Sequence, residues 1–173
     1  MSPAEEQLDV VDDHDHVIGV MSRSDVHRLG LRHRAVHIFL FRSSGQMLIH
    51  LRHADKEEFP SVWTSSASGH VSAGESYELS AQRELLEELG VHARLEKAGR
   101  FDACPDTSRE FTELFIAQSD AALRVDESEI SDVRWLSTSA IRTELAAIPE
   151  KFSPAFRLIF ADYMARDRAA NDD

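Results

Sequence analysis

The chain has 173 residues and a formal net charge of −12, and 42% of its residues are hydrophobic and 29% charged. These values fit one globular domain with a sizeable core, and the acidic balance argues against general nucleic-acid binding, which requires a basic surface. A single cysteine, Cys104, excludes an intramolecular disulfide. No apolar run reaches the roughly 18 residues of a membrane span, and the acidic N-terminus lacks a secretory signal, so we expect a cytoplasmic location.

The first third of the chain favours short strands. Residues 1–7 are expected to form a loose polar tail, and Ser22–Gly30 to hold a short helical turn. Runs rich in β-branched and aromatic residues predict four strands, the third of them central: Leu8–Val11, Val17–Met21, Arg34–Phe41 and Gln46–Arg52. The turn at residues 12–16 contains acids and histidines that could bind a metal, but a solvated hairpin tip is the preferred interpretation.

Residues 69–91, with the sequence GHVSAGESYELSAQRELLEELGV, carry the densest charge pattern. From Ser76 onward the segment is predicted to be helical, with Ser76 as the N-cap and Gly90 just past the end. On a helical wheel the leucines form an apolar stripe that should face the core: Leu79, Leu85, Leu86 and Leu89. Three carboxylates fall on the opposite side at i, i+3 and i+4: Glu84, Glu87 and Glu88.

This carboxylate patch predicts a metal site. Like charges at this spacing repel each other and weaken a helix unless a cation compensates. Carboxylate oxygens are hard ligands, and a cluster without cysteine or paired histidine suits Mg²⁺ or Mn²⁺, with Mg²⁺ usually shared with substrate phosphates. For an arbitrary helix of this pattern, a solvated acidic face is the alternative interpretation.

Two cations, Arg52 and Lys56, lie in the irregular stretch at residues 52–63, just before this segment. Phosphate contacts are expected, because arginine grips phosphate with two N–H groups and lysine acts as a point charge. A solvated charged loop is the alternative interpretation.

The second half of the chain alternates strand and helix patterns. Strands are expected within three ranges: Val91–Phe101, Phe111–Ala117 and Glu127–Leu136. Helices are expected at Ser137–Ala147 and Ser153–Arg168, with the last residues, 169–173, frayed. Strands followed by a helix in mid-chain and helices at the end predict an α/β fold, an α/β/α sandwich with a mixed sheet between helices.

The helical segment resembles the signature of the Nudix hydrolase family: Gly, five residues, Glu, seven residues, Arg-Glu-apolar-x-Glu-Glu-x-Gly-apolar. The matching residues are Gly69, Glu75, Arg83, Glu84, Leu85, Glu87, Glu88, Gly90 and Val91. A chance match at seven single-residue positions has a probability on the order of 10⁻⁹. The resemblance implies one Nudix domain over residues 1–173. It also implies that Mg²⁺ or Mn²⁺ binds to Glu84, Glu87, Glu88 and the Gly69 carbonyl, and that Glu75 and Arg83 form a loop-fixing ion pair.

A wider resemblance, over residues 8–136, is to the branch that includes isopentenyl-diphosphate isomerases and related hydrolases. In isomerases of this branch a cysteine precedes the Gly-His pair, and here Ser68 occupies that position. The acid on the later strand matches Glu113, whereas the second metal-binding glutamate has no counterpart because Phe111 stands there. His70 and two earlier histidines match the isomerase histidines, so a second metal site at His27 and His33 stays open.

The resulting hypothesis is a metal-dependent diphosphatase that cleaves a nucleoside diphosphate linked to another moiety, acting on a small phosphorylated molecule without nucleic-acid or membrane partners. The proposed catalytic residues are Glu87, Glu113 and Arg83, and the phosphate contacts are Arg52, Lys56 and His70. The general base is one of four acids: Glu87, Glu113, Glu127 or Glu129. An isomerase-like enzyme of isoprenoid diphosphates is the leading alternative, and a monomer and a homodimer are both compatible with the sequence. Four aromatic residues could stack on a base or belong to the core: Phe59, Trp63, Phe101 and Phe111.

Overall fold

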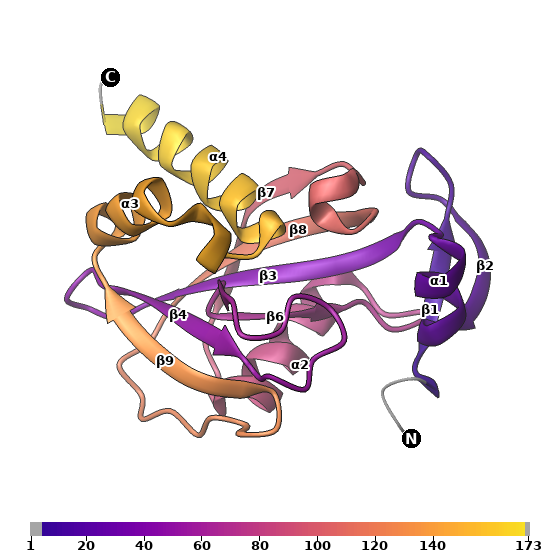
Figure 1. The fold of residues 1–173 in the computed structure, drawn as a ribbon, viewed down its shortest axis with the longest axis horizontal. Coiled ribbons are helices and arrows are strands. Elements are labelled where there is room, and N and C mark those ends of the chain that lie inside the picture. Colours follow the sequence, from indigo (N-terminus) through magenta and orange to yellow (C-terminus); the bar gives the residue numbers. More distant parts are fainter. Residues whose placement is uncertain (1–4, 172–173) are drawn as a thin grey trace.

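The protein is described by a computed structural model over residues 5–171 (Figure 1). Its strands in chain order are β1 Gln7–Val11, β2 Val17–Ser22, β3 His33–Phe41, β4 Met47–Arg52, β5 Trp63–Thr64, β6 Ala67–His70, β7 Leu95–Phe101, β8 Glu110–Gln118 and β9 Ile130–Leu136. The α-helices are α1 Arg23–Leu29, α2 Tyr77–Leu89, α3 Thr138–Ala147 and α4 Pro154–Asn171, and two short 3₁₀ turns lie at Pro105–Thr107 and Pro149–Lys151. Within these residues, no helix is long and apolar enough to cross a membrane.

A mixed sheet forms the centre of the molecule, in the order β5-β4-β3-β8-β7. The central strand β3 runs parallel to β8 along its whole length, because the chain between them carries α2 across one face. On its other edge β3 pairs with β6 over residues 35–38, and with β4 only at Phe41. This divergence of β4 and β6 leaves room beside β3 for side chains from both strands.

Helices cover both faces of this sheet. On one face α2 packs through Ala81, Leu85 and Leu89 against Val36, Ile38 and Leu40 of β3. On the other face α4 packs through Phe156, Ile159 and Phe160 against Phe39, with Ile141 of α3 in the same cluster. The α/β/α sandwich expected from the sequence is confirmed. Alternation along β3 explains it, because neighbouring side chains point to opposite faces and both faces are apolar.

The β1–β2 hairpin and α1 form a separate small layer beside the main sheet (Figure 1). Ser22 caps α1 by accepting the N–H of Asp25, and Gly30 ends it in the left-handed conformation at φ 62°. Arg34 of β3 holds the hairpin tip through its Nε, which donates to Asp15 at 2.6 Å. The hairpin thereby fixes α1, and with it His27, over one end of β3.

Three expectations are wrong in detail. Strand β1 begins at Gln7 and α4 continues to Asn171, so the predicted loose and frayed ends are shorter; residues 1–4 and 172–173 lie outside the described part. The α2 stripe is also rotated: Leu79 and Leu86 are 59% and 40% exposed, whereas Leu85 is buried. Side chains that share a wheel sector need not share an environment, and α2 directs Glu84 and Glu88 inward, where they line a cavity.

Candidate functional site

Helix α2 carries two of its carboxylates, those of Glu84 and Glu88, into the interior. Ser76 caps the helix by accepting the N–H of Leu79 at 3.2 Å, and Gly90 ends it at φ 66°. Glu84 and Glu88 are only 9% and 7% exposed, while the Glu87 side chain is 58% exposed. Burying two carboxylates one turn apart is costly unless a cation or hydrogen bonds compensate.

Gly69 allows one of these carboxylates to lie against the backbone. A Cβ atom added at residue 69 would overlap the carboxylate of Glu84, so the close approach requires glycine. The next turn of α2 brings Glu88 Oε2 within 3.1 Å of the Ser68 N–H, which donates to it. The loop before α2 and the helix thus place the Gly69 backbone beside Glu84 and Glu88.

The negative charges of Glu84 and Glu88 are only partly compensated by neighbouring groups of the protein. Burial raises the pKa of Glu84 to about 7, although Arg83 opposes the shift. Burial, reinforced by the charge of Glu84, raises the pKa of Glu88 well above its usual range. A divalent cation would favour the ionised form of both groups, and their oxygen-only donor set fits Mg²⁺ or Mn²⁺.

Arg83 joins the helix to the loop before it. Its NH2 group lies 3.0 Å from Glu75 Oε2 and donates to the His70 carbonyl at 3.1 Å. Its NH1 group contacts Glu84 at 2.6 Å and Glu87 at 3.3 Å. The pair expected between Glu75 and Arg83 is therefore present in the structure, as part of a larger network that also orients Glu84.

These carboxylates line a cavity of about 570 Å³ that is also lined by positively charged side chains. One of them is Lys56, which forms an ion pair with Glu129, another lining residue. Arg52 lines it too, but its Nε and NH2 groups donate to backbone carbonyls of Glu58 and Phe59 at 2.8–3.1 Å. Burial lowers the pKa of Arg52, which has no carboxylate hydrogen-bonded to it in the described structure. The Nε and NH2 edge of the Arg52 guanidinium is thus bound to the loop that contains Glu58 and Phe59, and NH1 faces away from these bonds.

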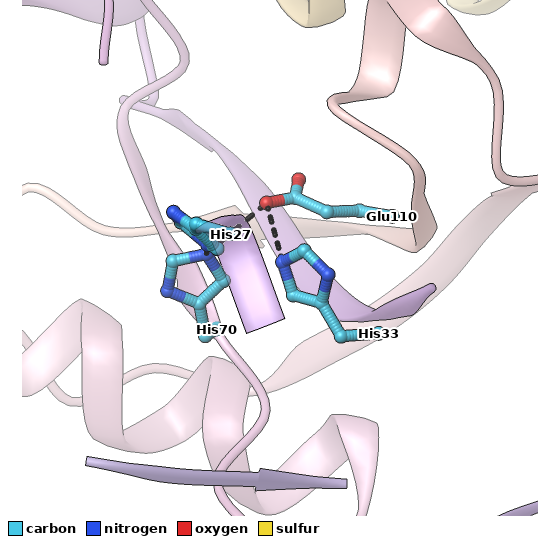
Figure 2. A group of neighbouring side chains, drawn as sticks. All are labelled: His27, His33, His70 and Glu110. Carbon is cyan, nitrogen blue, oxygen red and sulfur yellow. Dashed lines mark hydrogen bonds and ion pairs between the residues drawn. The ribbon is translucent and has the colours of Figure 1, made fainter. Parts of the chain in front are cut away.

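A second polar cluster is built from elements far apart in the sequence, and two of its members, His70 and Glu110, line the same cavity. The rings of His27, His33 and His70 converge on the carboxylate of Glu110 at the start of β8 (Figure 2). His70 Nε2 lies 3.1 Å from Glu110 Oε1 and 3.2 Å from His27 Nε2. His33 Nε2 lies 3.3 Å from the same Glu110 oxygen. The four ligand atoms lie within 4.8 Å of one another.

This cluster has the donor set of a transition-metal site. In the neutral form of His33, Nδ1 carries the proton because it lies 3.0 Å from the Leu31 carbonyl, and Nε2 is then the acceptor that a metal could use. That Nε2 atom is buried without a hydrogen-bond partner of good geometry in the described structure. Burial, together with the neighbouring His70 and His33, lowers the pKa of His27 to about 4. Neutral imidazoles and one carboxylate suit Mn²⁺, Fe²⁺ or Zn²⁺.

Comparison with known families identifies the family of this chain. The family model described as the NUDIX domain matches residues 31–156, which contain α2, the main sheet and most of the residues that line the cavity. The chain belongs to the Nudix family. An isopentenyl-diphosphate Delta-isomerase 2 of Photorhabdus laumondii is 32% identical over 160 residues, covering 90% of each chain. An uncharacterized Nudix hydrolase of Pseudomonas aeruginosa is 37% identical over 140 residues, covering 80% of this chain and 83% of that one. The crystal structure of DR0079 from Deinococcus radiodurans has a TM-score of 0.72 and 32% identity, covering 82% of this chain and 90% of that one.

The Nudix site does not bring all expected acids together. Glu113 is buried away from the cavity, with its carboxylate 2.5 Å from Lys97 Nζ and 3.5 Å from Arg100 NH1. Side chains alternate along β8, so Glu113 and Glu110 point to opposite faces. Glu127 is exposed outside the cavity, whereas Glu129 lines it. Of the four acids considered as the general base, Glu87 and Glu129 are therefore the two that line the cavity.

Sequence reasoning missed two residues of the site. One is Glu110, which lies beside the three histidines and directly before Phe111, where the sequence indicated no second metal-binding carboxylate. Arg23, the first residue of α1, also lines the cavity, and its buried Nε has no hydrogen-bond partner in the described structure. Neither lies in the signature segment. In the sequence, the signal for both residues was their charged side chain alone, and this signal is weak without the fold.

Proposed function

We propose that this Nudix protein is a divalent-metal-dependent hydrolase of the diphosphate linkage in a nucleoside diphosphate joined to another moiety. The observation that carries the proposal is the pair of buried, insufficiently compensated carboxylates, Glu84 and Glu88, facing a cavity that also holds Arg52 and Lys56. Bound Mg²⁺ or Mn²⁺ would neutralise phosphate charge and lower the pKa of a bound water. The Pseudomonas aeruginosa relative at 37% identity, named as an uncharacterized Nudix hydrolase, supports the assignment as a hydrolase and leaves the substrate open.

The roles of the chain's own groups follow from their positions. Glu84, Glu87, Glu88 and the Gly69 carbonyl would hold the metal, and Arg83 would keep Glu84 and Glu87 in place. Lys56 and the free edge of Arg52 would orient the phosphates, with Lys56 leaving Glu129 for the substrate. Glu87 or Glu129 would accept the proton of the attacking water, because both line the cavity.

Isomerisation of an isoprenoid diphosphate is the second candidate, favoured by the histidine cluster with Glu110. The relatives named as isopentenyl-diphosphate isomerases point the same way. Ser68 is the observation against it. Its hydroxyl has no base hydrogen-bonded to it in the described structure, and proton transfer at an alkene carbon needs a matched acid and base.

Isotope incorporation separates the two reactions. In ¹⁸O-water, with a panel of nucleotide sugars, dinucleotides, CDP-alcohols, coenzyme A and NADH, we expect ¹⁸O in one phosphate product. In D₂O, we expect isopentenyl diphosphate to gain no deuterium. Turnover should stop with chelator and return with Mg²⁺ or Mn²⁺, while Ca²⁺ should support it poorly. Efficient deuterium exchange without phosphate release from any nucleotide would reverse the assignment.

The close approach at residue 69 makes a separate prediction. Gly69→Ala should displace the Glu84 carboxylate while the φ angle stays accessible to alanine. Because misplacement of a catalytic group by about 1 Å costs on the order of 10²-fold, kcat should fall by about that factor. The far-UV circular dichroism spectrum should be unchanged. Wild-type turnover in Gly69→Ala would show that Glu84 does not act from its observed position.

A further inference from the structure

One aromatic side chain is left exposed at the cavity. Of the four that could stack on a base, Phe101 and Phe111 are buried at 8% and 4% exposure, and Trp63 packs in the cluster beneath α4. Phe59 is 40% exposed and lines the same cavity as Glu84, Glu88 and Lys56. A large apolar ring beside charged groups loses the benefit of burial unless a ligand covers it.

The backbone holds Phe59 in this position at a conformational cost. Its φ is +47°, and that of Ser61 is +55°, a region that non-glycine residues rarely adopt. Arg52 stabilises the turn from both sides. Its guanidinium donates to the carbonyls of Glu58 and Phe59, and its own carbonyl accepts the N–H of Ser61 at 3.2 Å. A strained loop that is tied down at a cavity mouth indicates a selected orientation of the ring.

The residues that line the cavity indicate which kind of ligand would cover the Phe59 ring. Apart from Phe59, the apolar residues lining the cavity are Ala35, Val36 and Ala155, and Val36 is fully buried. An isoprenoid chain would need apolar surface on several sides to bury its methyl groups. A nucleobase needs one flat aromatic face, and its polar edges tolerate charged and hydroxyl neighbours.

We propose that Phe59 is the platform on which the planar base of the substrate stacks, and that Arg52 is the positioning residue that holds it. The proposal rests on the proposed function and deepens it, because it assigns the group attached to the diphosphate. The metal and Lys56 would bind the diphosphate, and Phe59 would distinguish a base-bearing ligand from one without a base. Stacking reads the π-face of every base, so this subsite selects a class of ligand and leaves the individual base open.

Two kinds of probe test this directly: the four common nucleoside diphosphates, and ribose 5-diphosphate, which lacks the base. The dissociation constant of each probe is measured by calorimetry, with Ca²⁺ in place of Mg²⁺ to slow turnover. Phe59→Ala should weaken the nucleoside diphosphates about tenfold, the effect of losing one stacked base, and change ribose 5-diphosphate less than twofold. Phe59→Trp should restore tight binding, whereas Phe59→Leu should not. Ile18→Ala, at an exposed apolar residue of β2 outside the cavity, serves as the control.

Arg52→Lys tests the positioning role, because lysine keeps the charge and loses the fork that reaches two carbonyls. It should weaken the base-bearing probes more than ribose 5-diphosphate, whose smaller loss would come from the phosphate contact of Arg52 alone. Equal weakening of ribose 5-diphosphate and the nucleoside diphosphates by Phe59→Ala would overturn the inference, while wild-type hydrolysis would still support the proposed function. Selective weakening of geranyl diphosphate would overturn it too, in favour of an isoprenoid subsite. Selective loss for nucleoside diphosphates without hydrolysis of any nucleotide would uphold the platform and reject the proposed function.

Discussion

Glu88→Gln is expected to reduce turnover by about 10²–10⁴-fold and, at the same time, to stabilise the metal-free protein at pH 8. The glutamine keeps the shape and can still accept the Ser68 N–H. It removes a carboxylate whose pKa is raised by burial and by the charge of Glu84. A raised pKa means that the folded state holds a proton that the unfolded chain releases, so its stability falls as pH rises above about 4.5.

The stabilisation should therefore grow with pH. We expect the unfolding temperature of Glu88→Gln, measured with chelator, to match wild type near pH 4 and to exceed it at pH 8. A gain of about 1 kcal/mol corresponds to roughly 2–4 °C in a protein of this size. Mg²⁺ should raise the wild-type unfolding temperature at pH 8 and leave the variant nearly unchanged. A variant that is less stable than wild type at pH 8 in chelator would contradict the account of Glu88.

Glu110→Gln should destabilise the metal-free protein by about 3 kcal/mol at pH 6, the effect of removing one partner from a buried ion pair. Burial alone would raise the pKa of Glu110, but its close contacts with His33 and His70 outweigh burial and hold the pKa well below its usual range. Burial alone would lower the pKa of His33, but its contact with Glu110 outweighs that and the pKa is raised. Glutamine keeps the shape without the charge that protonated His33 requires.

The pH window distinguishes this pair from ordinary packing. The depressed pKa of Glu110 contributes stability above about pH 4.5, and the raised pKa of His33 contributes it fully below about pH 6.5 and loses it at higher pH. The loss in Glu110→Gln should therefore be larger at pH 6 than at pH 9, when measured by urea unfolding in chelator. Glu144→Gln, which breaks the partly exposed pair with Arg134, should cost less than about 1 kcal/mol. Equal losses in Glu110→Gln at both pH values would rule out the ion pair.

Much of the fold was predictable because local patterns and tertiary packing agree. The runs that form β3, β4, β8 and β9 are apolar or alternate as strands should, and α2 starts and ends at its predicted caps. The boundaries of β7 were less certain, since residues 91–94 are irregular and the strand begins at Leu95. The two-residue strand β5 and the short β6 have no sequence pattern of their own. They form because their neighbours in the sheet hold them.

The sequence by itself determined that the chain carries the Nudix helix, because the spacing of Gly69, Glu75 and Arg83 is local and the three glutamates follow the helical period. It also determined the sandwich, because the order of strand and helix patterns allows few alternatives. Only the tertiary structure decided that Glu84 and Glu88 are buried, because exposure depends on what packs over a helix face. Only the tertiary structure placed Glu110 beside the histidines and Glu113 away from the cavity. The reason is that the facing of β8 depends on its register with β3 and β7, and its own residues do not specify that register.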